Sequence, residues 1–106
     1  MLLTAFQCHK EPDNDVPACI KQKIAKLKIK PKTNPPARVY EYRDTTTGKK
    51  YYLFSAACCD QYDELYDALC HYVCAPSGGI TGGGDGKCGT LKQRLVQIRL
   101  IWKDER

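Results

Sequence analysis

The chain has 106 residues, a formal net charge of +5 and seven cysteines. This length leaves room for one hydrophobic core, and no stretch approaches the roughly 18 consecutive apolar residues that a membrane-spanning helix requires. Seven cysteines in so small a chain are unlike an ordinary cytosolic composition. They indicate either disulfides formed in an oxidising compartment or a metal site.

Residues 1–15 are expected to be a signal remnant and tether, ahead of a single disulfide-rich domain over residues 16–106. The short apolar run before Cys8 is similar to the end of a bacterial signal peptide whose last cysteine receives a lipid. Phe6 and Gln7 are bulkier than the small residues preferred at that point, so a terminus with a free thiol is the alternative. We predict Cys8 as a lipid anchor.

An amphipathic helix is predicted over residues 16–28. Asp15 is placed to cap this helix, and Pro17 suits its first turn. The apolar residues recur at the spacing of one helix face, and they are Val16, Ile20, Ile24 and Leu27. Cys19 borders this face, where it can reach both the core and a partner cysteine.

Residues 21–32 contain six lysines and no acidic residue. Such a run could meet nucleic acid or an anionic membrane. It lacks the arginines and interleaved aromatic residues that favour phosphate and base recognition. We therefore interpret it as a solvated helix face and loop, and we expect no nucleic-acid partner.

A β-hairpin is predicted over residues 38–55, with a turn at residues 44–48 in which Gly48 is free to take positive φ. Both arms are rich in tyrosine and β-branched or aromatic residues, which is typical of strands. Tyr40 and Tyr42 share one face of the first arm. We interpret them as cross-strand core residues rather than as a binding stripe.

The last predicted element is a strand over residues 95–103 that pairs with the hairpin, with Trp102 closing the core. The residues before it also fit helix spacing, so a helical first turn is expected as an alternative. Together these elements predict an α+β fold. An N-terminal amphipathic helix packs on a small antiparallel sheet made of the hairpin and the C-terminal strand, and a cysteine-stapled, glycine-rich loop covers one end.

Neighbouring cysteines at Cys58 and Cys59 point to opposite sides of an extended chain, so they are expected to bond to two different partners. The candidate partners are Cys19, Cys74 and Cys88, with Cys70 as a further candidate. We expect the helix to be linked to one member of the pair and the Cys74–Cys88 region to the other. Without Cys8, six cysteines allow about 15 connectivities, and the sequence does not choose among them.

A zinc site is the alternative use of these cysteines. Cys70 and Cys74 have the spacing of one half of a zinc knuckle, with His71 between them, but the second half is missing. A calcium site built from Asp60, Asp63, Asp67 and Asp85 matches no EF-hand spacing. Asp85, between two glycines, is expected to cap a turn with its side chain instead. We therefore expect no metal and no cofactor.

Six of the eight glycines lie in residues 78–86. A phosphate-binding loop needs Ser or Thr after its Gly-Lys pair, whereas Cys88 follows Gly86 and Lys87 here. We predict instead a tight loop over residues 76–87 whose turns need positive φ and whose ends are held by cysteines. This loop is the candidate binding surface, and its residues are Ser77, Gly78, Gly79, Thr81, Asp85 and Lys87.

Catalysis is not expected. His71 neighbours Cys70, and a cysteine beside a histidine can form an activated nucleophile. However, residues adjacent in sequence rarely have the required geometry, and these cysteines are expected to be oxidised. No pair of carboxylates stands out with a positioned partner.

Several segments resemble a small bacterial domain family of unknown function that is common in predicted lipoproteins of Gram-negative bacteria. They are CCDQ at residues 58–61, CAPSGGITG at 74–82, GDGKC at 84–88 and IWKD at 101–104. The resemblance covers most of the chain from about Cys19 to Arg106, and it implies a cell-envelope location, a lipid-anchor cysteine ahead of the domain and no known activity. The family has an Asn-Gly-type turn between two short strands where this chain has residues 68–71. Cys70 is thus additional to the pattern, and its pairing stays open.

Taken together, these features predict a non-catalytic binding or structural module of a cell-envelope protein, periplasmic or surface-exposed and lipid-anchored through Cys8. Its partner is expected to be an unknown protein or a small ligand, and the domain itself is expected to be a monomer. The alternatives are a zinc- or calcium-binding module and an inhibitor-like domain that presents the loop at residues 76–87. A disulfide-pinned loop suits the last role because it loses little entropy on binding.

Overall fold

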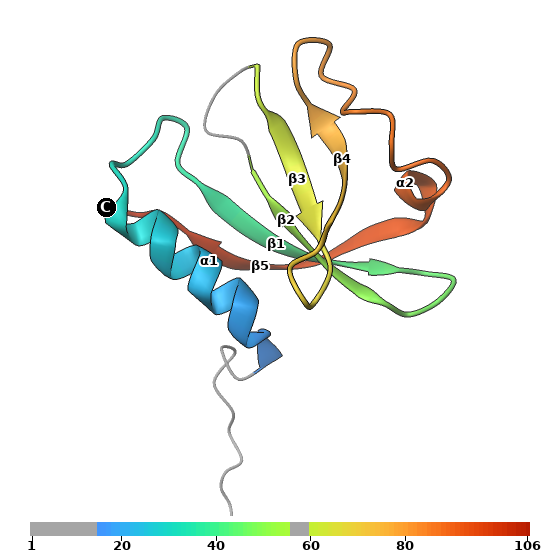
Figure 1. Cartoon of the computed structure of the whole chain (residues 1–106), viewed down its shortest axis with the longest axis horizontal. Helices are drawn as coiled ribbons and strands as arrows, with labels where there is room; N and C mark the ends of the chain where they lie inside the picture. The colour runs from blue at the N-terminus through green and yellow to red at the C-terminus, as the bar shows by residue number, and fades with distance from the viewer. Residues whose placement is uncertain (1–14, 56–59) are drawn as a thin grey trace, which may run out of the picture.

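A computed structural model describes residues 15–55 and 60–106 (Figure 1). Helices and strands follow one another as α1 (Ala18–Ile29), β1 (Arg38–Asp44), β2 (Lys50–Phe54), β3 (Tyr62–Tyr66), β4 (Tyr72–Gly78), α2 (Leu91–Arg94) and β5 (Leu95–Lys103). The predicted α+β class is confirmed. Figure 1 shows α1 and α2 at opposite ends of the molecule. Within the described ranges, no helix is long and apolar enough to cross a membrane.

The five strands form one antiparallel sheet in the order β4-β3-β2-β1-β5. The hairpin β1–β2 and the strand β5 beside β1 lie where the sequence predicted them, and α2 supplies the helical turn that precedes β5. The predicted sheet was too small, because β3 and β4 extend it on the far side of β2. Their connection at residues 67–71 is the turn between two short strands that the family resemblance implied.

Helix α1 begins at Ala18, two residues later than predicted. The expected cap at Asp15 is wrong, since no side chain caps this helix. Pro17 holds the N-cap position with an extended ψ of 147°, and its carbonyl oxygen accepts hydrogen bonds from the backbone N–H groups of Ile20 and Lys21. Proline suits this place because it brings no N–H that would need an acceptor.

One face of the sheet packs against α1, and we call it the helix face. Its buried residues are Val16, Ile20, Ile24, Val39 and Tyr52. The predicted apolar stripe of α1 is therefore the stripe that is buried. Trp102 packs against the same cluster, as predicted, together with Leu27, Phe54 and Tyr66.

The opposite face, which we call the loop face, is covered by the segment that follows the glycine-rich loop, through Cys88, Leu91 and Leu95. Its buried residues are Tyr51, Leu53, Leu65 and Cys74. Tyr40 and Tyr42 pack against this cluster, so both tyrosines are core residues as predicted. The two faces separate because successive side chains of a strand point to opposite sides.

The end of the chain is tied to the end of α1 through Arg106. Its guanidinium donates hydrogen bonds to the backbone oxygens of Lys28 and Lys30 and to the carboxylate of Asp104. The last carbonyls of a helix have no partner within the helix, so these bonds satisfy them from outside. The hydrogen bonds from Arg106 outweigh the effect of burial and lower the pKa of Asp104 to about 2.

Candidate functional site

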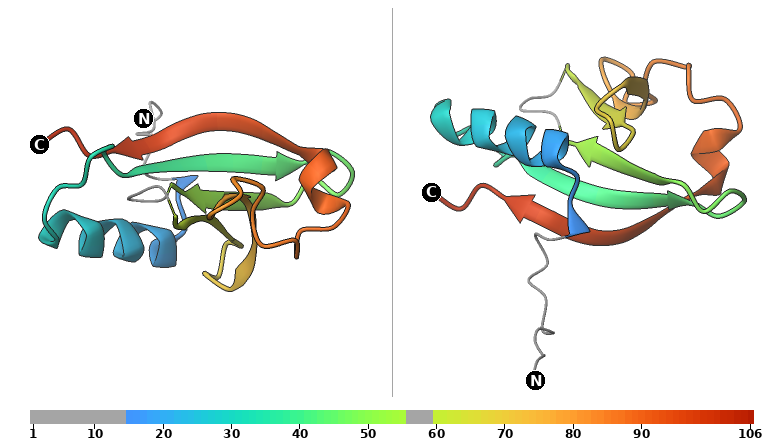
Figure 2. Two further views of the ribbon diagram at one scale, coloured as in Figure 1. Left: turned by 90° about the horizontal axis from the view of Figure 1, so that it is seen from above. Right: turned by 60° about the horizontal axis from the view of Figure 1, so that its bottom comes forward.

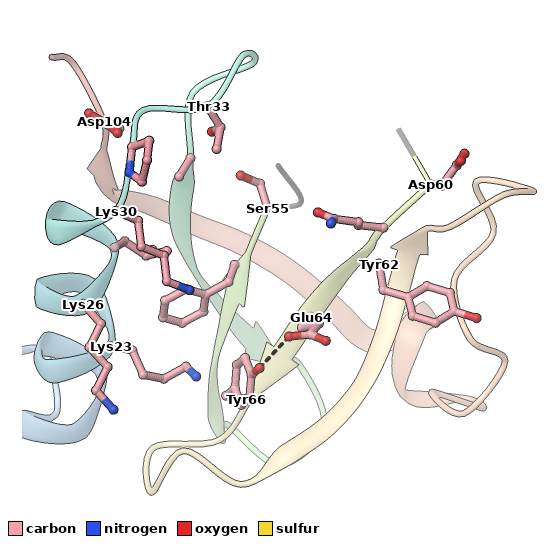
Figure 3. A pocket seen from close by; sticks show the side chains of 15 residues that line it. Lys23, Lys26, Lys30, Thr33, Ser55, Asp60, Tyr62, Glu64, Tyr66 and Asp104 are labelled. Carbon is pink, nitrogen blue, oxygen red and sulfur yellow. Dashed lines mark hydrogen bonds between the residues drawn. The ribbon is translucent and has the colours of Figure 1, made fainter. Parts of the chain in front are cut away.

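A cavity lies between α1 and the strands β2 and β3, on the helix face (Figure 3). It has a volume of about 740 Å³. The helix side contributes Lys23, Lys26 and Lys30, and the strand side contributes Phe54, Tyr62 and Tyr66. We call this space the α1 cavity. Pockets that bind small organic molecules commonly measure roughly 300–1,000 Å³ and combine aromatic walls with a few charged groups.

Lys23 stands at the aromatic wall of the α1 cavity. Its Nζ lies 4.1 Å from the ring centre of Tyr66 and 5.3 Å from that of Phe54. The two rings meet edge to face at 5.5 Å. An ammonium group is attracted to the negative face of an aromatic ring, so both rings hold Lys23 in place while its charge still faces the cavity.

The hydroxyl of Tyr66 donates a hydrogen bond to Oε1 of Glu64 at 2.6 Å. Burial, and then this hydrogen bond to a carboxylate, raise the pKa of Tyr66 well above its usual range. The phenol therefore stays neutral at physiological pH. It acts as a fixed donor to Glu64 and does not supply a phenolate base.

The other two lysines of the α1 cavity leave positive charge free for a ligand. Within residues 15–55 and 60–106, the ammonium groups of Lys26 and Lys30 have no hydrogen-bond or ion-pair partner. Figure 3 shows Lys23 and Lys30 extending from α1 towards the strands. Asp104 also lines the cavity, but Arg106 neutralises its carboxylate. The helix side of the cavity thus favours an anionic group.

The glycine-rich loop predicted as a binding surface folds back along the outer edge of β4, where the N–H groups of Gly84 and Asp85 donate to the backbone oxygens of Gly78 and Ala75. Ser77 and Gly78 belong to β4, and the Ser77 hydroxyl donates to Asp63 at 2.8 Å. Gly79 donates its N–H to the backbone oxygen of Gln61 at 2.8 Å. A Cβ on Gly78 would come within 2.6 Å of the same oxygen, so this glycine is needed for close approach of the backbones.

Asp85 organises the rest of this loop and, as predicted, caps a turn. Its Oδ1 accepts hydrogen bonds from the backbone N–H groups of Ala75 and Lys87, at 3.1 and 2.9 Å, and its Oδ2 accepts from the Tyr72 hydroxyl. These bonds, led by the one from Tyr72, lower the pKa of Asp85. Burial, and then the bond to Asp85, raise the pKa of Tyr72 to about 12.

The remaining predicted loop residues are exposed. The Thr81 hydroxyl accepts a hydrogen bond from the N–H of Gly83 at 3.2 Å, and the Lys87 side chain is solvent-exposed. The structure therefore brings the predicted residues together in one loop. Several of their polar groups are satisfied by hydrogen bonds within the loop and to the neighbouring strands β3 and β4. Binding by this loop stays a prediction.

Among the residues that the structure describes, the disulfides are Cys19–Cys70 and Cys74–Cys88. The expected bonds from Cys19 and from the Cys74–Cys88 region to the neighbouring pair at residues 58–59 are wrong, because these four cysteines bond among themselves. The pair at residues 58–59 lies outside the described residues, as does the predicted lipid anchor Cys8. Cys70 is not a spare thiol; it links the β3–β4 turn to α1.

The zinc alternative loses its main ligands, because Cys70 and Cys74 are both oxidised and a disulfide sulfur is no thiolate ligand. In the part of the chain that the structure describes, no three His, Cys, Asp or Glu side chains are close enough to hold a metal ion. His71 instead contacts Asp67, with Nδ1 3.2 Å from Oδ2. Burial opposes ionisation of Asp67, but hydrogen bonds from the backbone of His71 and Leu69 outweigh it and lower its pKa.

Sequence reasoning missed the α1 cavity. Lys23 belonged to a lysine run that we interpreted as solvated, although it follows Ile20 by three positions and so borders the buried stripe. Phe54 and Tyr66 lie on the same sheet face only because β2 pairs with β3, with Tyr52 opposite Tyr66. The spacing of Lys23 could have indicated a lysine at the edge of the core, but not what it would contact.

The fold and site place the chain in a class of small disulfide-linked α+β domains. It belongs to the family described as Domain of unknown function (DUF6970), whose model matches residues 25–104. The match includes the C-terminal part of α1 and the whole sheet, and it begins after Cys19. No curated protein and no solved structure matches the chain.

Proposed function

We propose that this domain is a non-catalytic binding module of a cell-envelope protein and that its ligand site is the α1 cavity. The observation that carries the proposal is the cavity of about 740 Å³ in which the Lys23 ammonium group faces the Tyr66 ring and which Lys26 and Lys30 also line. The ligand that suits it is a small organic anion with a planar apolar part. The anion would meet Lys30 and Lys23, and the planar part would pack on Phe54 and Tyr66.

Two ionisable groups among the described residues that line this site favour binding over chemistry. The phenol of Tyr66 is held neutral, and Glu64 is occupied by its hydrogen bond to that phenol. General acid–base catalysis works best with a group whose pKa lies near the working pH, and the raised pKa of Tyr66 moves it away from that range.

An NMR titration of the ¹⁵N-labelled chain tests the site, with benzoate as an aromatic anion and inorganic phosphate as an anion without a ring. We expect benzoate to shift amide signals of α1, β2 and β3 and to bind more tightly than phosphate. Lys30→Ala should weaken benzoate binding about tenfold, because a hydrogen bond to a charged group contributes roughly 1.5–3 kcal/mol. Lys21→Ala, which removes an exposed lysine of the same helix outside the cavity, is the matched control.

Equal losses in the two lysine variants would mean that only the general positive charge attracts the anion. Shifts confined to residues 76–87 would move the ligand site to the loop. Either result contradicts the α1 cavity as the binding site.

The envelope location is supported by two disulfides, since disulfides persist in oxidising compartments and are rare in the cytosol. Cys8 is proposed as the lipid anchor. Expression of the chain with its natural upstream region in a Gram-negative host, followed by intact-mass measurement, should find a lipid on Cys8 and none in Cys8→Ala. Reduced cysteines in protein isolated from the envelope would contradict this part of the proposal.

A second candidate function is an inhibitor-like domain that presents the glycine-rich loop. The observation that favours it is the loop's rigid frame, held by Cys74–Cys88 and Asp85, with the apolar side chain of Ile80 89% exposed at its tip. Hydrogen exchange measures this directly. We expect slow exchange at the N–H groups of Gly84 and Asp85, and fast exchange there would contradict a rigid loop.

A further inference from the structure

The outward side of α1 is strongly basic. Residues 21–32 contain six lysines and no acidic residue, and all of these lysines except Lys23 are exposed. In the part of the chain that the structure describes, the ammonium groups of Lys21 and Lys28 form no hydrogen bond or ion pair. Asp15 precedes the helix, and Glu105 lies with Lys28 beside its last turn. Positive charge therefore dominates the whole length of the exposed helix side.

The lysines flank the outermost line of the helix instead of occupying it. At 3.6 residues per turn, Lys21 and Lys28 lie along one border of this line, away from the α1 cavity, and Lys26 lies along the other border, where it lines the cavity. The line itself carries no charge, and its exposed residues are Ala18, Gln22, Ala25 and Ile29. Lysine side chains can lie along an apolar surface and place their ammonium groups at its charged border. This arrangement suits a flat partner that is apolar within and anionic at its surface.

Two strongly exposed apolar residues lie at the two ends of this basic surface. Among the described residues, Ile29 and Leu69 are two of the three most exposed large apolar residues, at 84% and 74%. Ile29 ends α1, and Leu69 lies in the β3–β4 turn, which the disulfide Cys19–Cys70 holds against the first turn of the helix. Figure 2 shows α1 and this turn projecting from the same side of the sheet. We call the exposed side of α1 together with the β3–β4 turn the basic ridge.

The composition of the basic ridge favours a lipid surface over a nucleic acid. It contains no arginine and no Phe, Tyr or Trp, the residues that grip phosphates and stack on bases. Anionic headgroups attract clustered lysines, and an exposed aliphatic residue beside them can enter the headgroup layer. The acid of the ridge, Asp67, is held by hydrogen bonds from the backbone of Leu69 and His71 and lies against the His71 ring. Its carboxylate is largely buried and therefore opposes such an approach only weakly.

We propose that the basic ridge docks on the anionic surface of a lipid bilayer, with α1 parallel to the membrane plane. This replaces the interpretation of the lysine run as a solvated face. The proposal rests on the proposed envelope location, and Cys8, the proposed lipid anchor, precedes Ala18 by ten positions. One lipid chain and one basic surface together supply the two signals that stable membrane attachment requires. The ligand proposal is separate, because Lys21 and Lys28 do not line the α1 cavity.

Cosedimentation with lipid vesicles tests the proposal on the full chain without a lipid on Cys8. We expect binding to vesicles of equal parts phosphatidylethanolamine and anionic phosphatidylglycerol, weakening as ionic strength rises, and little binding to phosphatidylcholine vesicles. Lys21→Glu/Lys28→Glu should weaken the binding at least about tenfold, since each lysine beside an anionic surface contributes roughly a fivefold gain in affinity. Lys49→Glu/Lys92→Glu changes the net charge equally but at the other end of the molecule, at the β1–β2 hairpin and α2, and should have a much smaller effect.

The apolar part of the ridge has its own test. Ile29→Ser and Leu69→Ser should each weaken vesicle binding severalfold, whereas Ile80→Ser, at an equally exposed site in the glycine-rich loop, should not. Circular dichroism checks that every variant folds.

The vesicle result and the lipid anchor can fail separately, because the chain tested carries no lipid. An unlipidated chain that binds neither kind of vesicle, or both kinds equally, would overturn the proposal. Equal losses in the two charge-reversal variants would also overturn it, since they would leave only a general attraction. Tighter binding to duplex DNA than to the anionic vesicles at the same ionic strength would assign the lysines to nucleic acid instead.

Discussion

The two faces of the sheet are covered in different ways, although each has one disulfide. On the helix face, Cys19–Cys70 joins residues 51 positions apart and holds α1 against the β3–β4 turn. On the loop face, Cys74–Cys88 joins residues only 14 positions apart and closes the glycine-rich loop. A rigid helix held at one end leaves a cavity beneath its other half. On the loop face, Leu91 and Leu95 pack directly against the sheet and leave little space.

The different covers of the two faces explain where a ligand site can form in so small a domain. The loop side encloses a cavity of about 120 Å³ lined by Leu53, Leu65 and Leu95, against about 740 Å³ on the helix side. Glycines allow the loop backbone to approach β4 directly, with Gly84 beside Ala75. A helix cannot approach so closely, because its side chains keep the backbones apart.

Removal of each disulfide should give the largest difference in stability and ligand binding between the two faces. In the loop-entropy model, the double variant Cys19→Ala/Cys70→Ala loses about 4 kcal/mol of unfolding free energy and Cys74→Ala/Cys88→Ala about 3 kcal/mol. Urea unfolding measures both values. Only the first variant should also weaken benzoate binding, since it frees α1. Equal effects of the two variants on binding would mean that the disulfides do not divide the molecule in this way.

Glycine substitution tests the close packing of the glycine-rich loop on β4. A Cβ on Gly84, at φ +86°, would lie 2.0 Å from the backbone oxygen of Ala75, whereas one on Gly82, at φ +80°, meets nothing within 4 Å. Gly82→Ala should therefore cost about 1 kcal/mol for its positive φ alone, and Gly84→Ala at least about 2–3 kcal/mol because strain and a backbone clash add. Thermal unfolding compares them. Similar losses would contradict tight packing of the loop on β4.

The stability of the fold should decrease at acid pH through one carboxylate beside α1 and one in the glycine-rich loop. The folded-state pKa values of Asp104 and Asp85 are lowered, so each carboxylate stabilises the fold above about pH 4 and loses that effect as pH falls through the folded value, near pH 2 for Asp104. Asp104→Asn and Asp85→Asn should each lower the Tm by a few degrees at pH 7. The difference from wild type should shrink towards pH 2. A difference that is constant with pH would exclude the ionised carboxylates as its source.

Alkaline conditions should loosen the glycine-rich loop through Tyr72. The folded pKa of Tyr72 is raised to about 12, so its stabilising effect is complete below the unfolded value near 10 and is lost as pH rises towards 12. We expect wild type to lose Tm between pH 10 and pH 12 by more than Tyr72→Phe does. Equal losses in the two proteins would show that the hydrogen bond from Tyr72 to Asp85 does not set this dependence.

The smallest effect is expected at Lys23. Its contacts with the rings of Tyr66 and Phe54 are partly exposed, so Lys23→Ala should cost less than about 1 kcal/mol of stability. If Lys23 binds the ligand, the same variant should weaken benzoate binding severalfold. A clear loss of stability without a loss of affinity would instead assign Lys23 to the core of the helix face.

Sequence alone determined the elements whose local pattern matches their environment. The stripe of α1, the hairpin β1–β2 and the strand β5 are visible because their apolar residues recur at helix or strand spacing. The turn at Asp85 is visible for a similar reason, since a short acidic side chain between glycines caps its own backbone. Disulfide chemistry was also apparent from the number of cysteines in so short a chain.

Only the tertiary structure decided the strands β3 and β4, the cysteine pairs and the cavity. β3 contains two acids and β4 contains Pro76 and glycine, which are poor strand formers in isolation. They become strands because β2 offers a pairing edge and because Ser77 bonds to Asp63 across them. Disulfide pairing depends on Cα distances, here 6.1 and 5.1 Å, which arise only when distant segments pack. The α1 cavity has the same origin, since Lys23 meets Tyr66 only after the helix has docked on the folded sheet.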